Sequence, residues 1–188
     1  MVYAVLLKRR ASNMMMKKGG KGGGRTITGL RFEARKPLED VIRSLPGYSI
    51  SDDVVYFKGQ EVARFYTKNK LYKNLLEPKG VDYTKLISKK LLPDDAIFII
   101  SNNTLFVVEI KFQEVTGSVD EKLQTCDFKN KQYQKLLSPL GIKVKYVYLL
   151  NDWFGKKEYK DVLEFVSAVG CYYFFHEIPL DFLGLPQP

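Results

Sequence analysis

Residues 93–112 read PDDAIFIISNNTLFVVEIKF, two apolar runs separated by a short polar segment. Residues 96–100 and 105–112 each have the length and the β-branched and aromatic content of a buried strand, and residues 101–103 have the composition of a tight turn. A turn this short predicts that the two strands lie side by side and run antiparallel. The segment therefore predicts a β-hairpin at the centre of the fold.

The residues that follow alternate between helical and extended patterns. Two amphipathic stretches have their apolar residues on one helical face, and two short segments are rich in Tyr, Val, Leu and Phe. The predicted elements are a helix at 119–137, a strand at 144–150, a helix at 157–169 and a strand at 171–175. This order predicts an α/β fold with a mixed central β-sheet flanked by helices.

The residues before the central hairpin predict smaller elements. Apolar residues recur at helical spacing over residues 28–45, which predicts one helix kinked at Pro37 or two short helices. Residues 53–57 and 61–66 flank Lys58-Gly59, which predicts a small hairpin. Two further short helices are predicted at 70–76 and 83–88.

The charge of the chain is concentrated at its beginning. Seven of the nine net positive charges come from residues 1–25, which contain no acid, so residues 26–188 carry +2. We expect a basic, Gly-rich and partly flexible leader over residues 1–27 and one compact domain over residues 28–188. The basic excess indicates a polyanionic partner. Because neutralisation of phosphates supplies most of the affinity for DNA, a domain with a net charge of only +2 indicates that another component supplies part of that affinity.

Counts of rare residues exclude several kinds of site. The single histidine, His176, excludes His-Asn-His nucleases and histidine-rich zinc centres. Cys126 and Cys171 form no CxxC or zinc pattern, so we expect reduced, partly buried thiols. No apolar run approaches the ~20 residues that cross a bilayer, and we expect a cytoplasmic protein with no membrane contact. In an enzyme of this composition, carboxylates and lysines must perform the chemistry.

Charged residues gather at one end of the predicted hairpin. Strand alternation places Glu109 and Lys111 on the same face, with Ile110 turned away. Antiparallel pairing brings Asp94, which follows Pro93, beside Glu109. Charges within an apolar strand are costly unless they meet partners or a metal ion. We therefore predict a site of two carboxylates and one lysine at this edge of the sheet.

Such a set of side chains suits the hydrolysis of a phosphodiester. Two carboxylates can hold Mg²⁺, for which Mn²⁺ can substitute, and leave coordination positions for water and phosphate. The cation polarises the phosphate and lowers the pKa of bound water. The lysine can orient or deprotonate that water and offset the charge of the transition state.

Pro93-Asp94, followed fifteen positions later by Glu109-x-Lys111, resembles the signature of the PD-(D/E)XK nuclease superfamily. Further stretches resemble type II restriction endonucleases, and they are FQ (112–113), GSVDEKLQTC (117–126), YLLNDWF (148–154) and FFHEIPL (174–180). The resemblance covers about residues 28–185. It implies a restriction-endonuclease-like core that cleaves double-stranded DNA. The catalytic residues would be Asp94, Glu109, Lys111 and the helix-borne Glu33, with the metal on Asp94, Glu109 and Ile110, whose only oxygen is its backbone carbonyl.

Within that group, the size and the near-neutral domain resemble the small subunit of a heterodimeric type IIS restriction endonuclease. The resemblance implies that a larger subunit recognises an asymmetric site and nicks one strand, while this chain cuts the other. A self-sufficient homodimeric restriction enzyme is the second interpretation. A catalytically inactive DNA-binding or assembly module on the same fold is the third.

Several assignments stay open at the level of the sequence. Asp95 is the alternative to Asp94 as metal ligand, although alternation directs it to the opposite face. Glu33 is equally consistent with a solvated helix carboxylate, and Glu109 with Lys111 could form a simple ion pair. Four lysines follow in the predicted helix as a solvated face, of which one or two are expected to contact phosphate: Lys122, Lys129, Lys131 and Lys135. The tyrosines of the later strands are expected in the core.

Overall fold

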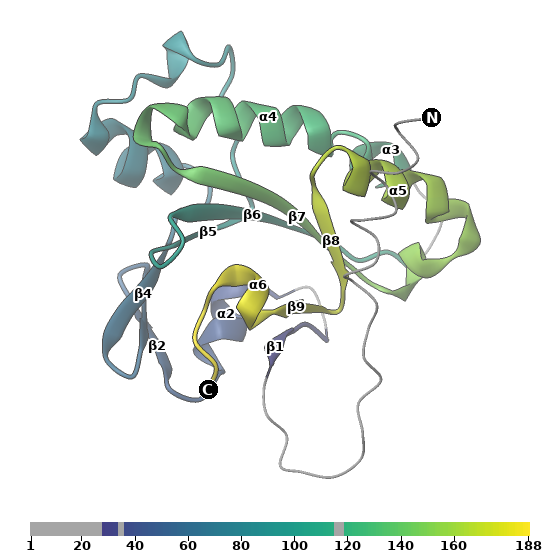
Figure 1. The fold of residues 1–188 in the computed structure, drawn as a ribbon, viewed down its shortest axis with the longest axis horizontal. Coiled ribbons are helices and arrows are strands. Elements are labelled where there is room, and N and C mark those ends of the chain that lie inside the picture. Colours follow the sequence, from purple (N-terminus) through teal and green to yellow (C-terminus); the bar gives the residue numbers. More distant parts are fainter. Residues whose placement is uncertain (1–27, 34–35, 115–118) are drawn as a thin grey trace, which may run out of the picture.

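The computed structural model describes residues 28–33, 36–114 and 119–188. Its centre is a seven-stranded sheet in the order β2-β3-β4-β5-β6-β7-β8 (Figure 1). The strands are β2 (Tyr48–Ser51), β3 (Val54–Phe57), β4 (Gln60–Phe65), β5 (Asp95–Ile99), β6 (Thr104–Lys111), β7 (Lys143–Leu150) and β8 (Tyr172–Phe175). Pairing is antiparallel from β2 to β6 and parallel from β6 to β8. This confirms an α/β fold with a mixed central sheet.

Helices and a second, two-stranded sheet surround the large sheet. The α-helices are α2 (Leu38–Arg43), α3 (Val119–Leu123), α4 (Cys126–Leu137), α5 (Lys160–Ala168) and α6 (Leu180–Leu183). The small sheet pairs β1 (Gly29–Arg31) with β9 (Glu177–Pro179). Short helical turns are the π-helical Leu71–Leu76 and the 3₁₀ turns Glu77–Lys79, Tyr83–Lys85, Ser138–Leu140, Asp152–Gly155 and Lys157–Tyr159. No helix of the described residues is long and apolar enough to span a membrane.

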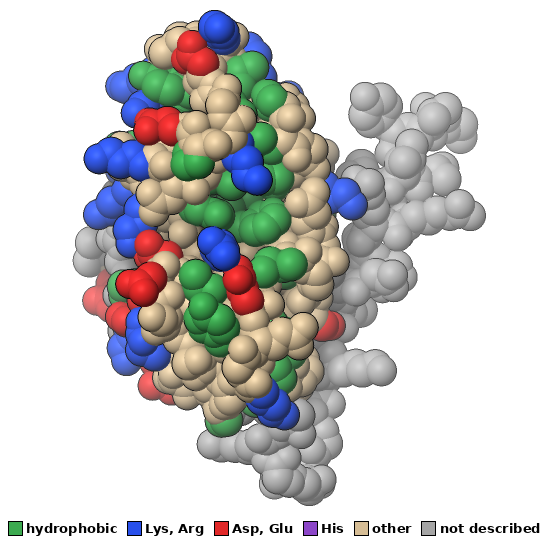
Figure 2. Space-filling model, turned by 90° about the vertical axis from the view of Figure 1, so that its left-hand side faces the viewer, with side chains coloured by type: hydrophobic (Ala, Val, Ile, Leu, Met, Phe, Trp, Pro, Cys, Tyr) green, Lys and Arg blue, Asp and Glu red, His purple; other side chains and the backbone are tan. Residues whose placement is uncertain are grey.

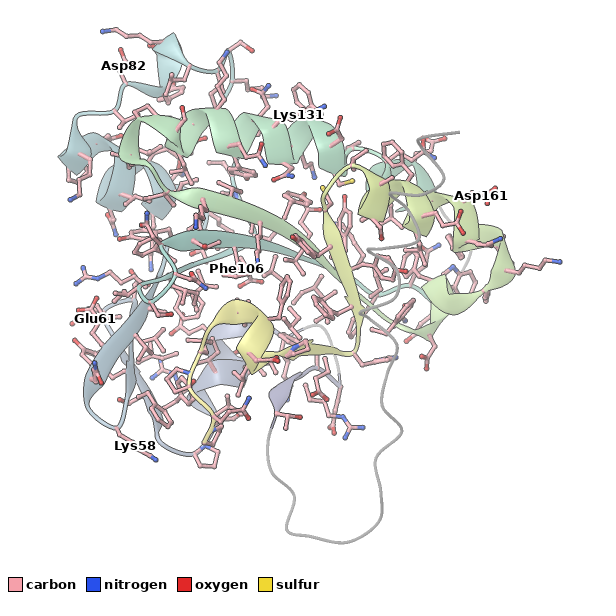
Figure 3. All side chains as sticks on the ribbon, in the orientation of Figure 1. Lys58, Glu61, Asp82, Phe106, Lys131 and Asp161 are labelled. Atoms are coloured by element: carbon pink, nitrogen blue, oxygen red, sulfur yellow. The ribbon has the colours of Figure 1, made fainter. Side chains whose placement is uncertain are left out.

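The two faces of the large sheet pack against different layers. Helices α4 and α5 cover one face, and α2, α6 and the small sheet cover the other (Figure 1). Along β6, Phe106 and Val108 belong to the core on the α2 side, whereas Leu105 and Val107 belong to the core on the α4 side. Figure 3 shows Phe106 on the α6 side of the sheet. Burial on both faces explains why the central strands are almost continuously apolar.

The four predicted central strands are confirmed within one residue at each end. The β5–β6 hairpin, the crossover through α4 to β7, and the crossover through α5 to β8 follow the predicted order. The small hairpin of β3 and β4 turns at Lys58 and Gly59, which have φ of 50° and 81°. Positive φ at both central residues is the geometry of a type I′ turn, whose twist matches the strands.

The helix predicted over residues 28–45 is wrong in its first half. Gly29–Arg31 form β1, and among the described residues of this range only Leu38–Arg43 are helical, with Pro37 at the N-cap. Leu30 and Phe32 are two residues apart, a spacing that puts both side chains on one face of a strand but not of a helix, and the pairing partner of β1 lies at the far end of the sequence. The adjacent strand β2 was not predicted either.

The long helix predicted at 119–137 is divided. Helix α3 ends at Leu123 and α4 begins at Cys126. The Tyr148 hydroxyl donates a 3.1 Å hydrogen bond to the Lys122 carbonyl, which is one of the carbonyls freed by the break. The leader predicted over residues 1–27 lies outside the described residues.

Candidate active site

The site lies where the ladder between β5 and β6 ends. Asp95 is paired with Val108, the last register pair of that ladder, so Asp94 precedes the paired region on the side of Glu109. The ladder between β6 and β7 continues three residues further, to Lys111 opposite Leu150. Glu109 and Lys111 therefore lie beyond the last residue pair between β5 and β6. At these positions β6 is still paired with β7.

Glu109 is the centre of this site. It is only 8% exposed. Its Oε1 accepts a hydrogen bond from the hydroxyl of Tyr146 on β7 and a 2.6 Å hydrogen bond from Lys129 Nζ on α4. Lys111 Nζ lies 3.1 Å from its Oε2. One ammonium group from β6 itself, a second from α4 and a phenol from β7 thus meet at a single buried carboxylate.

The ionisation of Glu109 follows from these contacts. Burial by itself would raise the pKa of this carboxyl, because it removes water from the charged form. The hydrogen bonds from Lys129 and Tyr146 and the charge of Lys111 outweigh burial and lower the pKa of Glu109 below its ordinary value. Glu109 is therefore an anion at neutral pH, which a metal ligand must be.

One oxygen of Glu109 keeps acceptor capacity. Within the described residues, Oε2 is buried and accepts no hydrogen bond, although the ammonium of Lys111 is within ion-pair distance. Buried polar atoms are normally paired, and an exception asks for an explanation. An oxygen turned toward a cation or a water position would account for it.

Asp94 and Asp95 have different surroundings. Asp95 is buried, and its Oδ1 accepts a 3.2 Å hydrogen bond from the backbone N–H of Leu38 on α2, on the side of the sheet away from Glu109. Asp94 is exposed, and its charge, after that of Glu109, helps to raise the pKa of Tyr133 on α4, for which burial is the main cause. Strand alternation from Asp95 directs Asp94 to the Glu109 side of the sheet, and within the described residues no hydrogen bond or ion pair joins it to Glu109 or Lys111.

Ile110 and Lys111 complete the end of β6. The Ile110 side chain packs into the core on the α2 side, which leaves its backbone carbonyl as the only oxygen it can offer to a metal ion. The Lys111 side chain is 20% exposed and that of Lys129 is 31% exposed. Both ammonium groups can therefore be reached from solvent while they contact the buried carboxylate.

Glu33 is not on a helix, contrary to the prediction. It lies two residues after β1 and is exposed. Within the described ranges, no hydrogen bond or ion pair joins Glu33 to Asp94, Glu109 or Lys111. The reason is the strand conformation of residues 29–31, which replaces the helix that would have carried Glu33. Its predicted catalytic role has no structural support.

The oxygen donors fit a hard divalent cation. Among the described residues, no three His, Cys, Asp or Glu side chains gather in a group that could hold a metal ion. Asp94, Glu109 and the Ile110 carbonyl provide two carboxylates and one neutral oxygen. Mg²⁺ is usually held by one or two carboxylates, with water and substrate phosphate as its other ligands. The spare capacity of Glu109 Oε2 agrees with this use.

Sequence reasoning missed two residues that contact Glu109. Tyr146 was expected in the core, where it lies, but its hydroxyl bonds to the carboxylate. Burial, followed by the charge of Glu109, raises the pKa of Tyr146, so the phenol remains a donor. Lys129 was expected on a solvated face. It lies three residues after Cys126 and four before Tyr133, both buried, so helical periodicity could have separated it from the other lysines.

Residues near the site support its shape. The side chain of Asn151 accepts from the backbone N–H of Gln113 at 3.3 Å and donates to its carbonyl at 2.8 Å, which joins the segments after β6 and β7. His176 contacts Asp152 at 2.9 Å. Cys126 and Cys171 are buried free thiols, as predicted.

The comparisons with known proteins add nothing to this description. No family model, no curated protein and no solved structure matches the chain.

Proposed function

We propose that the protein is a Mg²⁺-dependent endonuclease that hydrolyses phosphodiester bonds of double-stranded DNA. The observation that carries the proposal is the meeting of Glu109 and Lys111 at the end of the β5–β6 ladder, where Asp94 directly precedes β5. The resemblance to PD-(D/E)XK restriction endonucleases rests on these same three residues, and it supports the same activity.

Each residue has a distinct task in the proposed reaction. Asp94, Glu109 and the Ile110 carbonyl would hold the cation, which supplies Lewis-acid polarisation of the phosphate and activation of water. The Lys111 ammonium would orient the attacking water and offset negative charge as the phosphorus becomes five-coordinate. Tyr146 fixes the orientation of Glu109 from β7. A preformed arrangement of this kind lowers the cost of reaching the transition state.

The distribution of charge supports DNA as the substrate and a second protein as helper. Residues 1–25 bring seven positive charges and the remainder only +2. On the face seen in Figure 2, acidic, basic and apolar side chains are interspersed, and no unbroken basic surface covers it. We propose that the chain is the small, strand-cutting subunit of a cytoplasmic restriction system, with a larger subunit that recognises the site.

A plasmid assay tests this proposal. The purified chain is incubated with supercoiled plasmid and Mg²⁺, alone and with candidate large subunits encoded beside it. Nicking or cutting that appears only with the second protein supports the subunit proposal, whereas specific double-strand cleavage by the chain alone supports a homodimeric enzyme. Absence of cleavage under all these conditions contradicts the proposed activity.

A second candidate function is an inactive DNA-binding or assembly module. The observation that favours it is the contact of Glu109 with two lysines, Lys111 and Lys129, which neutralises the charge of the carboxylate without a metal. Metal binding separates the two candidates, because the inactive module has no need for a divalent cation. Calorimetric titration with Mn²⁺ in the presence and absence of DNA would distinguish them.

A further inference from the structure

Glu109 is held by two lysines, and the second one comes from a different layer of the fold. Lys111 is on β6, two residues from Glu109, and contacts Oε2 at 3.1 Å. Lys129 reaches down from α4 to contact Oε1 at 2.6 Å. Lys129 thus contacts Oε1, the same oxygen that accepts the hydrogen bond from the Tyr146 hydroxyl. One lysine is sufficient for the proposed chemistry, so the presence of Lys129 needs its own explanation.

The charges at the site cancel when Lys129 is in place. Asp94 and Glu109 contribute two negative charges, and Lys111 and Lys129 contribute two positive charges. A divalent cation that binds to Glu109 would lie within a few ångströms of the ammonium groups of Lys111 and Lys129. Partial burial of these groups strengthens their repulsion of the cation. The arrangement seen in the structure therefore opposes the metal ion that the site is proposed to bind.

Lys129 is the lysine that can leave. Its side chain is 31% exposed, against 20% for Lys111, and it extends from a helix whose outer face is solvated. Lysine has a flexible four-carbon stem and a compact charge that pairs readily with phosphate. A DNA phosphate at the mouth of the site would offer Lys129 a second anionic partner without any change in the backbone.

We propose that Lys129 is an electrostatic gate that couples metal binding to DNA binding, an inference that rests on the proposed nuclease function. Without DNA, Lys129 holds Glu109 and keeps the affinity for a divalent cation low. When DNA binds, phosphate draws Lys129 away from Glu109, and the remaining charge of −1 on Asp94, Glu109 and Lys111 accepts the cation. The hydrolytic site is thereby assembled only on DNA. By linkage, the cation must increase the affinity for DNA by the same factor.

The first experiment measures Mn²⁺ binding without DNA by calorimetry on the full-length chain. Lys129→Met and Lys129→Gln remove the positive charge, and both variants should bind Mn²⁺ about tenfold more tightly than the wild type. This factor corresponds to only part of the repulsion expected between an ammonium group and a divalent cation a few ångströms apart. Lys131→Met is the matched control. This substitution removes the same charge from the same helix. The Lys131 side chain, however, is 68% exposed, pairs with Asp127 and lies on the outer side of α4 (Figure 3). The control should bind Mn²⁺ like the wild type.

The second experiment measures the coupling itself. The dissociation constant of a fluorescent duplex of mixed sequence is determined by anisotropy, once in EDTA and once in Ca²⁺. Ca²⁺ should strengthen DNA binding by the wild type and by Lys131→Met. In Lys129→Met the strengthening should be smaller than in the wild type, because only the part that comes from direct contact between the cation and phosphate remains. Thermal melting confirms that all variants are folded.

The outcomes separate the gate from the nuclease. If Lys129→Met binds Mn²⁺ no more tightly than the wild type while the wild type cleaves plasmid, the gate is overturned and the nuclease proposal stands. If no variant binds Mn²⁺ with or without DNA and none cleaves, both proposals are overturned. Tighter Mn²⁺ binding in both Lys129 variants, with reduced coupling and an unchanged Lys131→Met, is the result that supports the gate.

Discussion

The Asp95 carboxylate accepts a 3.2 Å hydrogen bond from the backbone N–H of Leu38, the first residue of α2. This bond ties the proline-started helix to the strand that carries the site. It also assigns Asp95 to the α2 side of the sheet, the opposite side from Glu109. The choice between Asp94 and Asp95, which the sequence leaves open, therefore favours Asp94 as the proposed ligand.

Asp95→Asn should stabilise the protein at neutral pH. Burial, with a smaller contribution from neighbouring acids, raises the pKa of Asp95 from 3.8 to about 6 in the folded protein. The folded state therefore binds this proton more tightly than the unfolded state. The free energy of unfolding should fall as pH rises from about 4 to about 6, by at most about 3 kcal/mol. Asparagine keeps the Oδ1 acceptor but cannot ionise.

Urea unfolding in metal-free buffer at a series of pH values measures this effect. The gain in Asp95→Asn should be full above about pH 6 and vanish below about pH 4. Asp94→Asn, at an exposed position, is the matched control and should show no comparable gain. An unchanged or lower stability of Asp95→Asn at neutral pH would contradict the account of Asp95.

Glu109→Gln and Lys111→Met should each reduce plasmid cleavage by at least about a hundredfold, the usual cost of losing a group that stabilises the transition state. The fold should persist, because the side chains lie at the end of β6 rather than in either core. Supercoiled-plasmid nicking is measured beside thermal melting. Cleavage at the wild-type rate in either variant would refute the assignment of the site.

Tyr146→Phe should lower the cleavage rate by about tenfold without abolishing it. The phenol orients Glu109 but does not contact the reacting phosphate in the proposed mechanism, and a single hydrogen bond to a charged group contributes roughly 1.5–3 kcal/mol. Its ring packs against Tyr133 and Tyr148, and phenylalanine preserves that packing. Tyr48→Phe, which removes a buried hydroxyl that donates to the Pro186 carbonyl on the other face of the sheet, serves as the control. Equal rates in the wild type and Tyr146→Phe would argue against a positioning role.

Cleavage should require Mg²⁺ or Mn²⁺, while Ca²⁺ should support DNA binding better than cutting. Oxygen ligands accept all three ions, but Ca²⁺ is larger and coordinates with looser geometry. Gel electrophoresis of plasmid with each ion tests this order. Full activity in excess EDTA would rule out the metal-dependent mechanism.

Removing residues 1–25 should weaken DNA binding and reduce its dependence on salt. This segment carries seven positive charges, and each phosphate that it neutralises contributes about 0.9 to the slope of log K against log salt. Gel shifts in Ca²⁺ over a salt series compare the full-length and shortened chains. Tight, sequence-specific binding that the truncation leaves unchanged would contradict the helper role and favour a homodimer.

The sequence predicted the parts of the fold that short-range patterns control. The β5–β6 hairpin and its end, where Glu109 and Lys111 share a face, follow from strand alternation and a three-residue turn. Strand β1 was mistaken for helix because its partner, β9, is almost 150 positions away. Lys129 was not assigned to the site because its distance from Glu109 depends on how α4 packs across the sheet, and Tyr146 was not assigned because its distance depends on the register between β6 and β7. Local periodicity does not determine that packing.

The small sheet has a consequence for the time at which the protein becomes functional during its synthesis. β1 is among the first described residues to leave the ribosome, yet its partner Glu177–Pro179 is among the last. Leu180 N–H also bonds to the Thr28 carbonyl at 3.0 Å. The layer that covers one face of the central sheet therefore closes only when nearly the whole chain has emerged. A nascent chain that has emerged only as far as β8 has Asp94, Glu109 and Lys111 but not this layer, so we expect the proposed activity to appear only after residues 177–180 have emerged.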